Sequence, residues 1–370
     1  MKLTWIENGF ESEEYFAPFT VNKDCDYFTD LQERYNKLIS QAKGAGADDK
    51  SIAILEKYKR KILEALNSYY EADIAKCNSI IKKLISKIRD DSFASSSLLD
   101  SYASTGAHDK ELQLFRGRTG NPSCSYKKKD MLYLSREMRA KSGNYRFSIP
   151  GNPSWYLANS SYGCWIETGF PSEENFNVSP VLIDGTQRIF NLAISIGEID
   201  ELNEFDSERV HCWLKLLMLM IATSYRVEEE NRIFKSEYII SQAIMMACMK
   251  LGYDGVAYFS KRVSNEIFAY CAINLALFVR YDYQSKLLNH IKIDDPFNYS
   301  VYKQLLPSLK YKDYDLRTTA PGKITNIGSF DRQYPYSEIE YSNFDKFLFT
   351  SWRDKPNGCG KDEIPWGVCP

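Results

Sequence analysis

Residue patterns that bind metals or form disulfides are scarce in this sequence of 370 residues. It contains three histidines and nine cysteines, and no two cysteines form a Cys-x-x-Cys pair. An odd number of scattered cysteines argues against a disulfide framework and is typical of a protein kept in a reducing compartment. No histidine is spaced with a cysteine as zinc ligands are, so we expect no metal site.

The sequence also lacks a dominant charge and a long apolar run. It has 47 basic and 49 acidic residues, so a general attraction to nucleic acid or to anionic membranes is not indicated. The most apolar run, Trp213 to Ala222, contains a lysine and is too short to span a bilayer. The segment from Met1 to Asn8 turns polar too soon for a secretion signal. We therefore expect a soluble cytoplasmic protein without nucleic-acid or membrane partners.

Apolar residues at helical spacing dominate the first part of the chain. One pattern runs from Asp26 to about Lys43 and ends at Gly44 and Gly46. A longer stripe favours a helical hairpin that packs on itself or on the main domain, although a dimerisation or partner-binding arm would show the same pattern. The stripe consists of Leu55, Tyr58, Ile62, Leu66, Tyr69, Ile74, Cys77, Ile81, Leu84 and Ile88.

After a Ser- and Ala-rich boundary at 92–106, short apolar runs alternate with helical patterns, which predicts an α+β core. Beyond about Asp282 the chain is expected to be an irregular extension that packs partly on the core. The expected strands are 112–115, 155–157, 181–183, 189–194, 255–259 and 272–279. The expected helices are 160–168, 207–226 and 236–251, the last with a serine at its start and Gly252 past its end as cap signals.

One cluster of residues has the chemistry of a binding site. Arg146 precedes a Pro-Gly turn, Tyr156 lies on the short strand after it, and Glu167 lies near the end of the following helix. A strand followed by a short returning helix can bring Tyr156 and Glu167 to one cleft. Arginine binds pyrophosphate through its guanidinium fork, tyrosine stacks on planar rings, and a carboxylate stabilises an oxocarbenium ion. A surface ion pair is the competing interpretation.

Other groups are better explained without chemistry. The acidic run from Glu228 to Glu230 follows an apolar helix and is interpreted as a solvated helix end. Ser224 lacks a nearby histidine in the sequence, which leaves a Ser-His-Asp hydrolase with little support. Cys164 lies beside Trp165 on a predicted helix and is expected to be buried and inert.

Several segments together resemble the RES domain, a family of toxins from bacterial toxin–antitoxin pairs. The resemblance covers roughly residues 108–282. It implies a fold similar to that of ADP-ribosyltransferases and cleavage of NAD between nicotinamide and ribose. The segments, in order, are Leu114-Phe-Arg116, Arg146-Phe-Ser-Ile-Pro-Gly-Asn-Pro-Ser-Trp-Tyr-Leu-Ala158, Glu167, Gly252-Tyr-Asp-Gly-Val-Ala-Tyr-Phe-Ser260 and Asn274-Leu-Ala-Leu-Phe278.

The resemblance implies a role for each matching residue. Arg116 would contact the phosphates or a ribose of NAD, and Arg146 would orient the substrate or hold the turn. Tyr156 would lie beside the nicotinamide ribose. Glu167 would be the catalytic acid that stabilises the oxocarbenium-like transition state. Ser260 would form a hydrogen bond in the same pocket, and no metal would be needed.

The resemblance also implies the organisation and the function of the chain. We expect an N-terminal helical region at 1–105, a catalytic domain at 106–285 and a C-terminal extension at 286–370. The expected activity is an NAD glycohydrolase or phosphorylase that depletes cellular NAD in a toxin–antitoxin or phage-defence setting. An ADP-ribosyltransferase that modifies a protein, or a non-catalytic interaction protein, are the alternatives. The added segments could replace an antitoxin, sense a trigger or form a homo-oligomer.

Overall fold

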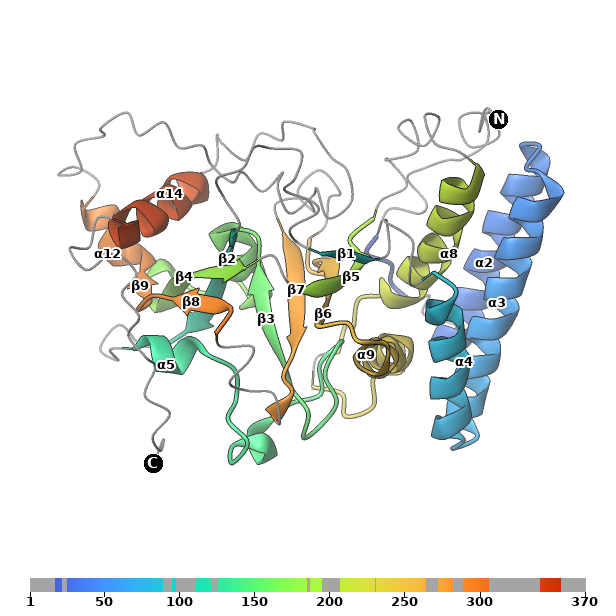
Figure 1. Cartoon of the computed structure of the whole chain (residues 1–370), viewed down its shortest axis with the longest axis horizontal. Coiled ribbons are helices and arrows are strands. Elements are labelled where there is room, and N and C mark those ends of the chain that lie inside the picture. The colour runs from blue at the N-terminus through green and yellow to red at the C-terminus, as the bar shows by residue number, and fades with distance from the viewer. Residues whose placement is uncertain are drawn as a thin grey trace.

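Figure 1 shows a computed structural model of the chain, in which a mixed β-sheet lies between two groups of helices. The long N-terminal helices lie at one end of the molecule, and the C-terminal helices lie at the other. The α+β architecture expected from the sequence is therefore confirmed. The structure describes residues 17–21, 25–88, 95–97, 111–120, 126–184, 187–194, 207–229, 231–263, 272–281, 289–305 and 340–353.

Within these residues, nine strands form one sheet in the order β1-β5-β6-β7-β3-β2-β4-β8, with β9 paired to β4. Only the β5–β6 pair is parallel among the described strands. All six predicted strands are present, as β2 (Glu111–Thr119), β3 (Ser154–Ala158), β4 (Phe176–Asp184), β5 (Arg188–Leu192), β6 (Gly255–Phe259) and β7 (Ile273–Phe278). Three short strands were not predicted, namely β1 (Ser95–Ser97), β8 (Ile291–Ile293) and β9 (Phe297–Asn298).

The register of the central strands sets up one end of the sheet. Asn274 on β7 pairs with Tyr258 on β6 and with Ala158 on β3. Directly opposite residues in antiparallel strands point to the same face, so these three side chains form one row. Ser260 directly follows β6, and its backbone N–H donates to the carbonyl of Ala272 at 2.8 Å. This end of the sheet is where the candidate site lies.

In the described part of the N-terminal region there are three helices, and each is preceded by an aspartate that caps it. They are α2 (Tyr27–Gly44), α3 (Asp49–Tyr70) and α4 (Ile74–Ser86). The side chains of Asp26, Asp48 and Asp73 each accept a hydrogen bond from a backbone N–H in the first turn. These caps satisfy donors that a helix start leaves unpaired, and the carboxylates also complement the helix dipole.

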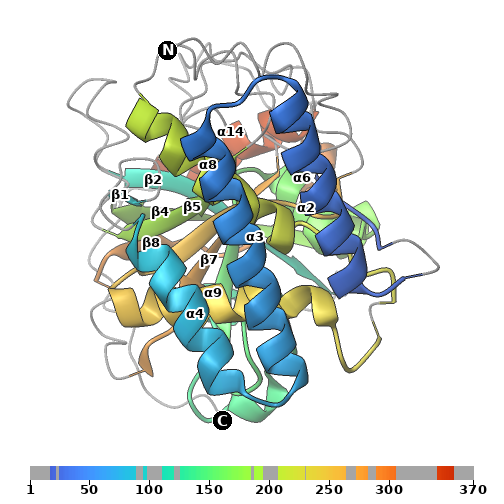
Figure 2. The ribbon, with the colours of Figure 1, turned by 90° about the vertical axis from the view of Figure 1, so that its right-hand side faces the viewer.

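The N-terminal helices pack on the main body, as Figures 1 and 2 show, so the interpretation as a packed hairpin is confirmed. The stripe residues are buried, except for Tyr69, which is partly buried, and Ile74, which is 47% exposed at the start of α4. Between this layer and the sheet lie α8 (Ser207–Thr223) and α9 (Ile239–Leu251). Because α8 contacts both α3 and β5, it is apolar on nearly all sides. No helix in the described ranges is long and apolar enough to cross a membrane.

Two expectations were wrong, one about the chain beyond Asp282 and one about the start of α9. The C-terminal part is not irregular throughout, because it contains α12 (Tyr299–Leu305) and α14 (Glu340–Arg353). Phe344 and Leu348 of α14 are buried in a cluster of aromatic side chains over β4. Ser236 does not cap α9 but begins a 3-10 turn that leads into it, whereas Gly252 ends α9 with a φ of +84° as expected.

Gly117 provides a test of how closely β2 packs on α6 (Ser161–Glu167). A Cβ at Gly117 would lie 2.7 Å from the Cβ of Cys164. We predict that Gly117→Ala lowers the free energy of unfolding by about 1–3 kcal/mol, because β2 and α6 must move apart. The control is Gly44→Ala, where a Cβ meets no atom within 4 Å. Urea unfolding measures both, and equal stability of the two variants would contradict this packing.

Candidate active site

A cavity of about 890 Å³ opens at the end of the central strands. Its volume lies in the range of pockets that hold drug-sized ligands. Two carboxylates, Glu167 and Glu228, are among its described lining residues. Basic side chains greatly outnumber them, so the cavity is positive although the whole chain is nearly neutral. The basic residues are Arg116, Arg118, Lys141, Arg146, Arg226, Lys235, Lys261 and Arg262.

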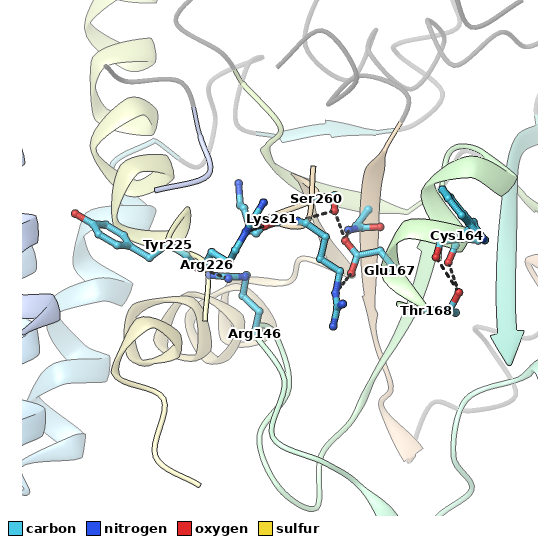
Figure 3. A network of polar contacts seen from close by, with 11 residues as sticks. Arg146, Cys164, Glu167, Thr168, Tyr225, Arg226, Ser260 and Lys261 are labelled. Carbon is cyan, nitrogen blue, oxygen red and sulfur yellow. Dashed lines mark hydrogen bonds and ion pairs between the residues drawn. The ribbon is translucent and has the colours of Figure 1, made fainter. Parts of the chain in front are cut away.

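Glu167 is the last residue of α6, and its carboxylate is fixed by two donors. The Oγ of Ser260 donates to Glu167 Oε1 at 2.5 Å, and Nδ2 of Asn274 donates to the same oxygen at 2.6 Å. The other oxygen, Oε2, lies 4.0 Å from Nε of Arg262. Because Ser260 and Asn274 are buried and Glu167 is one-third exposed, the carboxylate has a rigid inner side and an accessible outer side. Figure 3 shows the contact with Ser260.

Local sequence places Glu167 at the cavity. The hydroxyl of Ser160 caps α6 by accepting from the N–H of Gly163 at 2.8 Å. Helix α14 supports the same end of α6, because the carboxylate of Asp345 accepts from the N–H of Ser161 at 3.1 Å. The chain then turns sharply at Gly169, with a φ of +86°. The seven residues of α6 are therefore held at both ends.

Arg116 lies on β2 and contributes a partly buried positive charge to the cavity wall. Its Nη1 donates to the carbonyl of Tyr156 at 2.8 Å, and its buried Nε has no hydrogen-bond partner in the structure. Burial lowers the pKa of the guanidinium, because the charged form has lost part of its hydration. An anionic ligand at this wall would replace part of that solvation.

Tyr156 lines the cavity with its ring, while its hydroxyl belongs to the adjacent turn. The hydroxyl lies 2.8 Å from Oγ of Ser148 and accepts from the N–H of Phe147 at 3.2 Å. The ring of Tyr145 packs against it edge-on, with ring centroids 6.0 Å apart. Ring stacking is therefore the interaction that Tyr156 can offer a ligand without breaking the turn.

Arg146 is buried and supports the end of α8. Its two terminal nitrogens donate to the carbonyls of Thr223 at 2.7 Å and Tyr225 at 2.6 Å. The last carbonyls of a helix carry partial negative charge and lack partners within the helix, so a guanidinium is well placed there. Arg146 therefore ties its own turn to α8, and its charge also lines the cavity.

Sequence reasoning missed three residues of this site. Lys261 is buried, and its Nζ donates to Oγ of Ser224 at 2.8 Å. Burial lowers the pKa of Lys261 well below its usual value, the charge of Arg146 lowers it further, and Glu167 opposes both effects. Asn274 lies within a segment that resembles the family, and Lys261 directly follows Ser260. Their closeness in sequence to these matching residues could have indicated both. The role of Ser224 had no sequence signal.

Four of the five predicted site residues line the cavity, namely Arg116, Arg146, Tyr156 and Glu167. Ser260 lies behind Glu167 and contacts it. Cys164 is buried and burial raises the pKa of its thiol, as expected for an unreactive cysteine. No group of three or more His, Cys, Asp or Glu side chains in the described ranges could hold a metal ion.

Comparison with known proteins identifies the central part of the chain. Residues 123–290 match the family model of the RES domain. Over 166 residues the chain is 31% identical to the candidate toxin YopC of Bacillus subtilis (strain 168), a match that covers 42% of this chain and 37% of that protein. The MbcT–MbcA toxin–antitoxin complex of M. tuberculosis resembles this chain at 13% identity and covers 57% of this chain and 97% of that one, but a TM-score of 0.30 is too low to establish a common fold. The family match therefore assigns a RES domain to residues 123–290 alone.

The matched range includes most of the candidate site. Arg146, Tyr156, Glu167 and Ser260 all lie within residues 123–290. Arg116 and the whole of β2 lie before that range. The matched domain is therefore completed by a strand that precedes it in the chain.

Lys261 makes the stability of the protein depend on pH in a defined direction. Because its pKa is lower in the folded than in the unfolded chain, the unfolded chain binds more protons between the two values, and the unfolding free energy rises with pH there. We predict that the stability of the wild type relative to Lys261→Met increases by up to about 1.4 kcal/mol per pH unit as pH approaches about 10.4. Urea unfolding of both proteins from about pH 6 to about pH 10 measures this. A difference that stays constant or falls with pH would contradict a depressed pKa.

Proposed function

We propose that this protein binds NAD in the cavity and cleaves its nicotinamide–ribose bond. The observation that carries the proposal is the arrangement of Glu167, which Ser260 and Asn274 fix inside a cavity with a large excess of positive charge. Such a cavity suits a dinucleotide, whose pyrophosphate is anionic and whose reacting centre becomes cationic. The RES domain identified over residues 123–290 supports the same assignment.

Binding would use the basic wall and the aromatic side chains. The unpaired Nε of the Arg116 guanidinium, on the cavity wall, points to this residue as the anchor of the pyrophosphate. The ring of Tyr156 lies on the neighbouring strand β3 and would pack beside the nicotinamide ribose. Lys261 and Arg146 add positive charge deeper in the same cavity. These contacts would orient the glycosidic bond toward Glu167.

The chemical step would be a dissociative cleavage. The bond between the ribose C1′ and the nicotinamide nitrogen breaks, and nicotinamide leaves with the bonding electron pair. The positive charge that develops on the ribose is stabilised by the Glu167 carboxylate, whose Oε2 is not the oxygen bound by Ser260 and Asn274. Ser260 and Asn274 keep that carboxylate in position, so little reorganisation is needed as the charge develops.

The ADP-ribosyl group would then pass to a small acceptor, which makes the protein an NAD glycohydrolase or phosphorylase. With water, the products are ADP-ribose and a proton. With inorganic phosphate, the acceptor is itself an anion. The excess of basic residues in the cavity leaves positive charge for a second anion beside the pyrophosphate. Transfer to a protein side chain is the alternative, and labelled NAD in a cell lysate would reveal it as a modified protein band.

In a cell, this activity would act as a toxin by depleting NAD. The similarity of the RES domain to the candidate toxin YopC supports this biological role. An antitoxin that covers the cavity is the expected regulatory partner, and a cytoplasmic location follows from the substrate. The match spans only 37% of YopC, so these roles rest on the domain and its cavity.

The charge of Glu167 should be essential for cleavage. We predict that Glu167→Gln lowers kcat for nicotinamide release by at least about 100-fold, because a neutral amide cannot stabilise the developing cation. The matched control is Glu173→Gln, which removes an exposed carboxylate that pairs with Lys303 on the surface. Chromatography of the nicotinamide produced by the purified proteins measures both rates. Comparable rates for Glu167→Gln and the control would contradict the assignment.

Arg116 should contribute mainly to binding. We predict that Arg116→Lys raises KM for NAD by about tenfold with a smaller change in kcat, because lysine keeps the charge but loses the guanidinium fork. The control is Arg139→Lys, since Arg139 packs over the ring of Tyr281 and is not among the residues that line the cavity. Initial rates over a range of NAD concentrations separate KM from kcat. An unchanged KM would remove Arg116 from the binding site.

A further inference from the structure

A short segment, residues 223–226, joins the cavity to the N-terminal helices; it is called the connector below. It begins at Thr223, the last residue of α8. On its cavity side, the carbonyls of Thr223 and Tyr225 accept from Arg146, and Oγ of Ser224 accepts from Lys261. The connector therefore holds two buried basic side chains of the cavity.

The last residue of the connector also fixes the backbone beside the catalytic carboxylate. Nε of Arg226 donates to the carbonyl of Lys261 at 2.9 Å, and its Nη2 donates to the carbonyl of Val263 at 3.3 Å. Lys261 and Val263 lie one and three positions after Ser260, which contacts Glu167. Figure 3 shows this sequence of contacts from Tyr225 to Glu167. A shift of the connector would thus move the basic wall and the support of Glu167 together.

On its other side, the connector is fixed by residues from outside the RES domain. The hydroxyl of Tyr225 donates to Oδ1 of Asp30 at 2.7 Å and accepts from Nε of Arg34 at 3.0 Å, both on α2. The backbone of Phe19 forms a parallel bridge with Tyr225, with hydrogen bonds of 2.9 and 2.7 Å. In Figure 3 the Tyr225 ring points toward the N-terminal helices and away from Glu167.

The position of the connector matters because of the charges that it holds. Arg146 and Lys261 are both buried, and the charge of Arg146 lowers the pKa of Lys261, so the two cations repel each other. The acceptors that hold them in place come largely from the connector. Loss of an anchor on its far side lets these cations relax apart toward better solvation, at the expense of ligand binding.

We propose that Tyr225 is a positioning residue for the cavity. Through the Asp30–Arg34 pair on α2 it fixes the connector, and the connector sets where Arg146 and Lys261 present positive charge to a bound pyrophosphate. The N-terminal helices then help to set the geometry of the site. The proposal rests on the proposed function for the identity of the substrate. The effect of Tyr225 on anion binding, however, can be measured without catalysis.

The chain offers a closely matched pair of variants. Tyr225→Phe removes the hydroxyl and keeps the ring and the Asp30–Arg34 pair, whose atoms lie 3.4 Å apart. Tyr35→Phe removes another buried hydroxyl on α2, which donates to the carbonyl of Met218 within α8 at 2.6 Å. Tyr225→Phe loses two hydrogen bonds between α2 and the chain after α8, and Tyr35→Phe loses one between α2 and α8. Only the first loses a bond at the connector.

The test measures the affinity of the full chain for inorganic pyrophosphate by titration calorimetry, together with KM and kcat for NAD. Tyr225→Phe is expected to raise Kd and KM by about three- to tenfold and to leave kcat within about twofold, whereas Tyr35→Phe leaves all three unchanged. Asp30→Asn, which keeps an oxygen for the Tyr225 hydroxyl, is expected to bind nearly as wild type. Asp30→Ala should show the same loss as Tyr225→Phe.

Three results would overturn the proposal: unchanged pyrophosphate affinity in Tyr225→Phe, an equal loss in Tyr35→Phe, or no pyrophosphate binding by the wild type. A wild type that binds pyrophosphate but releases no nicotinamide from NAD would refute the proposed function alone, and the comparison of the variants would still decide the role of Tyr225.

Discussion

The hydrogen bonds from Ser260 and Asn274 to one oxygen of Glu167 are the interaction on which the site depends. They hold a carboxylate inside a cavity whose other described charges are mostly positive. Without them, Glu167 would be drawn to the surrounding arginines and lysines, of which Arg262 is already 4.0 Å away. With them, the negative charge has a fixed position and an open side, which is what stabilisation of a transient cation requires.

Each wall of the cavity is supported by a segment outside the matched RES domain. Asp345 on α14 caps α6, which carries Glu167. Asp30 on α2 binds Tyr225 in the connector, which holds Arg146. Strand β2, which supplies the Arg116 guanidinium, also precedes the matched range. The flanking segments are thus packed into the structure that forms the cavity, and partner binding is not needed to explain their apolar stripes.

Local patterns in the sequence were sufficient for much of this structure. The six central strands followed from short apolar runs, and the placement of Tyr156 and Glu167 at one cleft followed from a strand and a short returning helix. These features depend on neighbours in the chain. Helix α14 was overlooked although Phe344 and Leu348 are spaced as on one helical face, because polar and aromatic residues surround them. The division into three regions stays a prediction.

Contacts between distant segments could not be predicted in the same way. Arg146 binds carbonyls about 80 positions further along the chain, and Lys261 binds Ser224, which lies 37 positions before it. Nothing in the local sequence around Ser224 or Tyr225 indicates these partners. They arise because α8 ends beside the turn that carries Arg146, which is a consequence of the packing of α8 between α3 and the sheet.

A crystal structure of Glu167→Gln with NAD would test the central claim most directly, because the variant should retain the substrate uncleaved. The account predicts the pyrophosphate against Arg116 and the C1′–nitrogen bond beside residue 167, within the cavity at the end of β3, β6 and β7. NAD bound elsewhere, or an empty cavity at a saturating concentration of NAD, would contradict it.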